Sequence, residues 1–128
     1  MRVLLDTQAF LWWLSDASRL TDRALEVLGD PGTEVCVSVA SAWEIAIKAQ
    51  SGRLELAGPV ETYVPEQIRH HGFTPLEIHL DHALRAGGLP RHHADPFDRL
   101  LVAQGQLENL PIVTIDPLIG LYDVETIW

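Results

Sequence analysis

The sequence has little cysteine, little basic charge and no long apolar run. Its 128 residues contain one cysteine, Cys36, which excludes an internal disulfide and a cysteine-rich zinc site and fits a reducing compartment. Nine Lys and Arg residues stand against eighteen Asp and Glu residues, for a net charge of −9. This balance argues against coating nucleic acid by bulk positive charge, but not against an enzyme that carries its positive charge as metal ions. No apolar run approaches the ~20 residues of a membrane-spanning helix and no signal-peptide pattern is present, so we expect a cytoplasmic protein.

The pattern of apolar residues predicts an α/β fold. Hydrophobic residues make up 47% of the chain and charged residues 21%, which is typical of a globular domain, and we expect one domain over residues 1–128. Short apolar runs predict strands at residues 3–5, 34–38, 73–78, 112–115 and 124–127. Helical periodicity and caps predict helices at residues 7–14, 21–29, 40–50, 59–72, 80–86 and 95–108. The alternation predicts an α/β/α sandwich around a parallel sheet of about five strands.

Acidic residues fall where predicted strands end and predicted helices begin. Asp6 ends the first strand and Asp116 the fourth. Glu44 lies about one turn into the helix after the second strand, while Asp95 and Asp98 open the helix before the fourth. Because these positions share one edge of a parallel sheet, we expect the carboxylates to meet there. Crowded carboxylates repel unless a cation offsets them, and Mg²⁺ or Mn²⁺ is expected because hard divalent ions bind carboxylate oxygens. Such a site can activate water for phosphoryl chemistry.

Each of these residues also has an ordinary structural interpretation. The aspartates at positions 6, 95 and 116 could cap helices, and the one at position 98 is favourable in a first helical turn. Glu44 could form a surface ion pair with Lys48, four residues on. One of His92 and His93 could assist at the site, although a histidine in a loop is more often solvated. Thr114 could hydrogen-bond a phosphate or a water, or simply pack.

The segments that carry the acids resemble those of PIN domains, and specifically of VapC-type toxins. The matching segments are Leu4-Leu5-Asp6-Thr7, Ser41-Ala42-Trp43-Glu44-Ile45 with Lys48 and Gly52-Arg53-Leu54 following, His93-Ala94-Asp95-Pro96-Phe97-Asp98-Arg99-Leu100-Leu101-Val102-Ala103-Gln104, and Thr114-Ile115-Asp116. They occur in the family's order and span nearly the whole chain. The segment from 93 to 104 is the most specific, whereas the Asp-Thr pair alone would be weak. Gly105 departs from the pattern, because the family often has Ala there, and this costs about 1 kcal/mol of helix stability.

The resemblance implies a Mg²⁺- or Mn²⁺-dependent ribonuclease toxin that cleaves RNA phosphodiester bonds and inhibits translation. It also implies a homodimer and a cognate VapB-like antitoxin that neutralises the toxin. Carried over by position, the catalytic and metal-binding acids are Asp6, Glu44, Asp98 and Asp116. The possible auxiliary residues are Asp95, Thr7, Thr114 and His93. We further expect the antitoxin to place an Arg or Lys near Asp6 and Asp98, because an acidic pocket favours a cationic partner.

Two other functions fit parts of the same pattern. A haloacid-dehalogenase-type phosphatase also has an Asp at the end of its first strand and binds Mg²⁺, but the general acid two residues later is here Gln8. A catalytically dead PIN domain could act as a scaffold, and the complete set of acids argues against it. A dinucleotide-binding domain is disfavoured because no Gly-x-Gly-x-x-Gly follows the first strand.

Overall fold

A parallel sheet of five strands, in the order β3-β2-β1-β4-β5, forms the centre of the fold. The computed structural model describes every residue from Met1 to Trp128. The strands are β1 (Arg2–Leu5), β2 (Glu34–Ser38), β3 (Thr74–Leu76), β4 (Ile112–Val113) and β5 (Thr126–Ile127). The order puts β1 in the middle, so the residue that follows β1 lies at the centre of the sheet's carboxyl edge. The predicted α/β sandwich with a parallel sheet of five strands is confirmed.

Six α-helices connect and cover the strands. They are α1 (Thr7–Ser15), α2 (Asp22–Gly29), α3 (Val39–Gln50), α4 (Val60–His70), α5 (Leu80–Gly88) and α6 (Pro96–Glu108). Each helix begins and ends within two residues of its predicted bounds. Capping residues fix the starts of four of them, since the side chains of Asp6, Thr21, Ser38 and Asp95 accept hydrogen bonds from the first turns of their helices. Two 3₁₀ turns, η1 (Ala17–Arg19) and η2 (Ile119–Leu121), were not predicted. None of the helices has the length and apolar character to cross a membrane.

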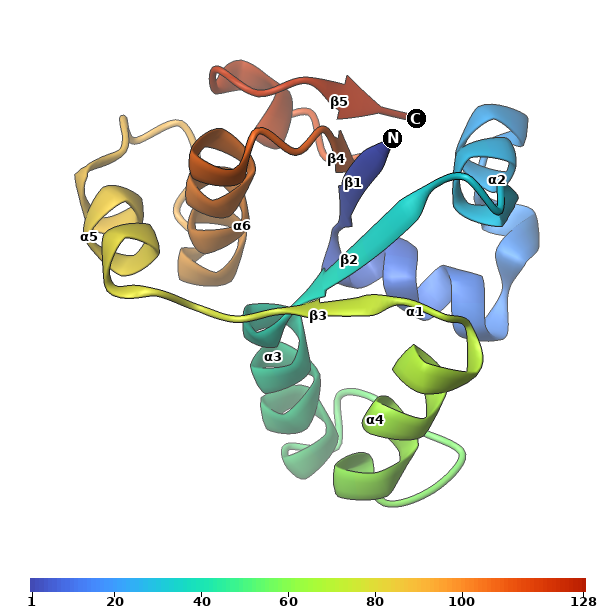
Figure 1. Cartoon of the computed structure of the whole chain (residues 1–128). Coiled ribbons are helices and arrows are strands. Elements are labelled where there is room, and N and C mark those ends of the chain that lie inside the picture. The colour runs from blue at the N-terminus through green and yellow to red at the C-terminus, as the bar shows by residue number, and fades with distance from the viewer.

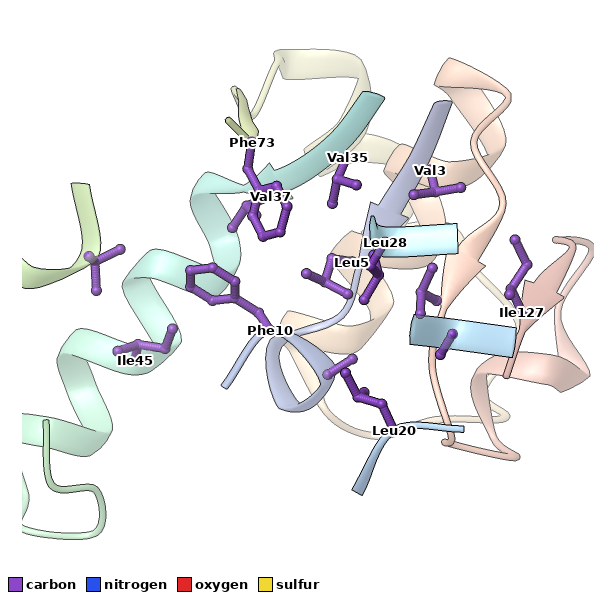
Figure 2. Close-up of a cluster of buried hydrophobic side chains, with 14 residues drawn as sticks. Val3, Leu5, Phe10, Leu20, Leu28, Val35, Val37, Ile45, Phe73 and Ile127 are labelled. Atoms are coloured by element: carbon purple, nitrogen blue, oxygen red, sulfur yellow. The ribbon is translucent and has the colours of Figure 1, made fainter. Parts of the chain in front are cut away.

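Alternation along the strands divides the core into two layers. Val3 and Leu5 face a cluster that includes Phe10 of α1, whereas Leu4 faces the opposite cluster with Leu101 of α6. Figure 1 shows α5 and α6 on one side of the sheet and α1 and α2 on the other. In the larger cluster the rings of Phe10 and Phe73 lie 6.3 Å apart and point towards one another (Figure 2). The two packed faces hold the sheet rigid, and this fixes the positions of the side chains at its edge.

Three strands are shorter than predicted. Phe73 belongs to the exit of α4, since its N–H donates to the Ile68 carbonyl, and β3 is confined to Thr74–Leu76. β4 ends at Val113 because the Thr114 hydroxyl accepts the N–H of Asp116 at 3.0 Å, which turns the chain away from the sheet. β5 occupies residues 126–127 only. A side-chain hydrogen bond to the backbone thus ends the β4 run early, and a backbone bond to α4 delays the start of β3.

Candidate active site

Asp6 stands at the carboxyl end of the central strand and begins α1. Its Oδ1 accepts the N–H of Ala9 at 2.7 Å, and its Oδ2 accepts the hydroxyl proton of Thr114. The residue is only 5% exposed. Burial raises the pKa of Asp6 to about 6, because desolvation penalises its charged form more than the two hydrogen bonds favour it. The hydrogen bond to Ala9 confirms that Asp6 caps α1, and Asp6 also belongs to the acid cluster.

Glu44 reaches the same edge from α3 and is also buried. Its Oε2 lies 2.7 Å from Lys48 Nζ, so the expected pair forms, but only its lysine is at the surface, because Glu44 is 6% exposed. The other oxygen, Oε1, is buried without a hydrogen-bond partner. An unpaired buried carboxylate oxygen is costly, and a bound cation would satisfy it.

Asp95 and Asp98 open α6 and differ in role. Asp95 caps the helix, since its Oδ1 accepts the N–H groups of Phe97 and Asp98 at 2.8 and 3.4 Å. Asp98 lines the cleft described below. Burial, followed by the nearby charge of Asp95, raises the pKa of Asp98 to about 7. Both acids line the cleft, but Asp95 also uses its Oδ1 as the helix cap.

His93 joins Asp98 to Asp116. Its Nε2 lies 3.0 Å from Asp98 Oδ2 and 2.8 Å from Asp116 Oδ2. Its Nδ1 accepts the N–H of Asp95 at 3.1 Å, so Nε2 carries the ring proton and donates towards the carboxylates. The interpretation of His93 as a solvated loop residue is wrong, because its side chain is 10% exposed. His92, by contrast, is exposed and packs edge-on against Tyr122, 5.0 Å between ring centroids.

The two predicted auxiliary threonines, Thr7 and Thr114, form hydrogen bonds that join neighbouring elements. The Thr7 hydroxyl donates to Ser41 Oγ at 2.8 Å and so ties α1 to α3. The Thr114 hydroxyl donates to Asp6 and accepts from the Asp116 N–H. Since both hydroxyls are occupied by neighbouring protein groups, neither is free for a phosphate in this arrangement.

Sequence reasoning missed a clamp on the loop that carries His93. The Arg99 guanidinium donates to the carbonyls of Ala86, Leu89, Pro90 and His93 at 2.9 to 3.3 Å. The Tyr122 hydroxyl donates to the Pro90 carbonyl at 2.7 Å and accepts the His93 N–H at 2.9 Å. No local pattern predicts these bonds, because their partners are spread from residue 86 to residue 122 and meet only in the folded chain.

These acids line one cleft of about 510 Å³. Its walls comprise Asp6, Thr7, Gln8, Leu11, Glu44, Lys48, Asp95, Asp98, Ile115, Asp116 and Pro117. Ligand atoms of His93, Asp98 and Asp116 all lie within 4.8 Å of one another. Hard carboxylate oxygens, the raised carboxyl pKa values and the unpartnered Glu44 Oε1 fit a divalent cation such as Mg²⁺ or Mn²⁺. The predicted meeting of the acids at one edge is what the fold produces.

Known proteins are similar to this chain in sequence and in fold. The family model for the PIN domain matches residues 3–123. Ribonuclease VapC22 of Mycobacterium tuberculosis is 32% identical over 118 residues, covering 89% of this chain and 86% of that protein. Ribonuclease VapC16 of the same organism is 38% identical over 78 residues, covering 58% and 54%. A solved complex, VapBC2 of Rickettsia felis bound to a promoter DNA fragment, superposes with a TM-score of 0.68 at 13% identity, covering 98% of this chain and 96% of that one.

Proposed function

This chain belongs to the PIN-domain family, with VapC ribonucleases among its relatives, and we propose that it is a metal-dependent ribonuclease toxin. It cleaves phosphodiester bonds in RNA, inhibits translation and acts in the cytoplasm. The observation that carries the proposal is the convergence of Asp6, Glu44, Asp98 and Asp116 on one cleft. Carboxylates so close together, two of them with raised pKa values, are expected where a divalent ion works.

In this proposal Asp6, Asp98, Asp116 and Glu44 hold Mg²⁺ or Mn²⁺. The bound ion would lower the pKa of a coordinated water and stabilise charge on the scissile phosphate. The chain's own groups prepare the oxygens. Thr114 and the α1 N-terminus orient Asp6, and Lys48 orients Glu44. His93 donates from Nε2 between Asp98 and Asp116, which holds their oxygens together before an ion binds.

The proposal includes an antitoxin and a second copy of the chain. Two solved structures of similar fold are VapBC complexes, and we propose that a VapB-like antitoxin neutralises this chain by placing an Arg or Lys near Asp6 and Asp98. A complex in which both acids stay open to solvent would contradict this.

We also propose a homodimer, because the apolar Leu80 and Leu84 are 77% and 68% exposed. A strictly monomeric mass by light scattering at high concentration would contradict the dimer.

The direct test is cleavage of single-stranded RNA by the antitoxin-free chain. We expect cleavage with Mg²⁺ or Mn²⁺ and none with EDTA. Asp98→Asn should abolish it, whereas Asp123→Asn, an exposed acid outside the cleft, should not. Equal cleavage in EDTA would contradict the metal mechanism.

The two alternatives make different predictions in assays of the same protein. Turnover of p-nitrophenyl phosphate would indicate a phosphatase, for which the amide of Gln8 in the cleft offers no general acid. A catalytically dead scaffold would show no heat of Mn²⁺ binding by calorimetry and no cleavage. The intact set of cleft acids favours the nuclease over both.

A further inference from the structure

A second hollow, of about 340 Å³, adjoins the acid cleft and differs from it in chemistry. Glu44, Lys48 and Asp95 line both. The rest of its wall is formed by Ile47, Arg53, Ala94, Pro96 and Phe97. We call it the side hollow. Besides apolar surface it contains two acidic and two basic side chains, and its volume lies at the lower end of the ~300–1,000 Å³ of small-ligand pockets.

An exposed aromatic surface borders the side hollow. Trp43 of α3 is 59% exposed and contacts Phe97 of α6 edge-on, with 5.2 Å between ring centroids and 81° between ring planes. Ile47, one turn further along α3, is 38% exposed. Edge contact with Phe97 fixes the Trp43 ring while leaving much of its surface uncovered. A fixed, open indole is a stacking surface for a nucleobase.

Basic groups complete the side hollow. Lys48 pairs with Glu44, but Arg53 forms no ion pair. The Arg53 Nε donates to Ser51 Oγ at 2.8 Å, and the two terminal nitrogens of its guanidinium have no partner. The chain has twice as many acids as bases, yet Arg53, which lies beside the cleft, forms no ion pair with a carboxylate. Its guanidinium is therefore free to bind a phosphate through two hydrogen bonds.

From these contacts we propose that the side hollow is a nucleotide subsite for the RNA strand that occupies the acid cleft. Trp43 stacks on a base, Phe97 and Ile47 form the apolar floor, and Arg53 binds a phosphate next to the scissile one. The substrate class is single-stranded RNA, because only an unpaired base can turn its face to the indole. This subsite rests on the proposed ribonuclease function.

The unpaired charge of Arg53 favours RNA over a cationic protein segment in this position. The peptide expected to neutralise the acid cleft carries Arg or Lys, and the Arg53 guanidinium would repel such a cation, whereas the charge of Lys48 is already balanced by Glu44. An RNA backbone has the opposite preference: it is repelled by the metal-free acids and attracted to Arg53. An RNA strand bound at the side hollow can therefore extend into the acid cleft when metal ions bound there make the local electrostatic field positive.

The test is binding of a short, unstructured, fluorescein-labelled RNA, measured by fluorescence anisotropy in EDTA with the RNA checked for integrity. Trp43→Ala should raise the Kd about tenfold, the loss typical of one stacked base, and Trp43→Phe should recover part of it. Arg53→Ala should weaken binding and reduce the slope of log K against log salt by about 0.7. Arg23→Ala removes one exposed charge on α2, outside both hollows, and is expected to leave the Kd unchanged.

Cleavage with Mg²⁺ is measured on the same variants to separate the subsite from the proposed activity. We expect Trp43→Ala and Arg53→Ala to raise KM more than they lower kcat, with the melting temperature of the wild type. Both variants binding RNA like the wild type would overturn the subsite, even if the wild type cleaves RNA, and would favour a protein occupant. RNA binding that depends on Trp43 and Arg53 in a chain that never cleaves would support the subsite and reject the nuclease.

Discussion

Asp6 shows at the scale of one residue how a structural and a functional role share a side chain. Its Oδ1 caps α1 through Ala9, while its Oδ2 is held by Thr114. Both roles follow from one location, because the residue that ends the central strand also begins the next helix. The resulting burial raises its pKa to about 6, so a charged Asp6 lowers the stability of the metal-free fold.

Replacing Asp6 by Asn tests this balance. In EDTA at pH 7 we expect Asp6→Asn to raise the free energy of unfolding by on the order of 1 kcal/mol, because Asn keeps the cap and removes the buried charge. The gain is partly offset by the loss of the charge-assisted bond from Thr114. Thermal melting and an RNA-cleavage assay measure the two effects, and cleavage should be abolished.

Two control conditions for the comparison of Asp6→Asn with the wild type are pH 4 and, separately, saturating Mg²⁺. At pH 4 Asp6 is already neutral in the folded protein, so the mutant should lose its advantage. With Mg²⁺ the wild type should gain more stability than the mutant, because a ligand that binds the native state stabilises it. A mutant that keeps activity and melts like the wild type would reduce Asp6 to a helix cap.

At the scale of an element, the loop between α5 and α6 is irregular but firmly held. Arg99 donates to the carbonyls of Leu89, Pro90 and His93, and the Tyr122 hydroxyl binds Pro90 and His93. The loop carries the histidine that bridges Asp98 and Asp116. Its backbone geometry, and so the position of the His93 ring, depends on partners outside the loop.

Tyr122→Phe should loosen this loop. Removing one hydroxyl deletes its bonds to Pro90 and His93 and leaves the His93 N–H unsatisfied, so we expect a loss of about 1–3 kcal/mol in urea unfolding. Displacement of His93 should lower kcat about tenfold, since small misplacements at a site are costly. Tyr63→Phe on α4 is the control, because no hydrogen bond is formed by the Tyr63 hydroxyl, and it should change neither quantity. Unaltered kcat in Tyr122→Phe would remove the clamp from the mechanism.

Gly105 shows how packing between elements overrides helix propensity. A Cβ added there would lie 3.0 Å from Ile112 Cδ1 and 3.2 Å from the Leu110 carbonyl oxygen. The close approach of α6 to β4 thus opposes the gain of about 1 kcal/mol that Ala brings to a helix interior.

Two matched glycine substitutions separate packing from propensity. We expect Gly105→Ala to leave stability unchanged or lower. Gly87→Ala in α5, where nothing lies within 4 Å of the added Cβ, should be neutral to stabilising by up to ~1 kcal/mol. Chemical unfolding of the two variants checks the difference. A clear stabilisation by Gly105→Ala would mean that Ile112 moves aside without cost.

For the whole molecule, the raised pKa values of Asp6 and Asp98 predict how stability varies with pH. Both carboxyls bind protons more tightly in the folded chain than in the unfolded chain, so their contribution is complete below pH 4 and is lost as pH rises towards 7. For Asp6, a pKa raised from 3.8 to about 6 corresponds to at most about 3 kcal/mol lost by neutral pH.

Urea unfolding from pH 4 to pH 7.5 measures this slope. In EDTA we expect these two groups to lower the free energy of unfolding across the range. Mg²⁺ should flatten the decline, because the ion binds the deprotonated carboxylates of the native state. The comparison of Asp6→Asn with wild type isolates one group, and identical pH profiles for the two would contradict a raised pKa at Asp6.

The sequence by itself determined the order of the strands and α-helices and the edge of the sheet at which the acids meet. Short apolar runs and cap residues sufficed, because strand burial and helix starts are set by neighbouring residues. The rule that parallel strands share one carboxyl edge then brought Asp6, Glu44, Asp98 and Asp116 together. The segment from 93 to 104 further indicated the family, which the comparisons confirm.

Only the tertiary structure decided how each acid is held and which of its neighbours is buried. The burial of His93 between two carboxylates, the Arg99–Tyr122 clamp and the unpartnered Glu44 Oε1 arise from contacts between residues far apart in the chain. The pKa values of Asp6 and Asp98 likewise depend on desolvation by packed neighbours. Burial and distance are properties of the assembled layers, and no local pattern of residues encodes them.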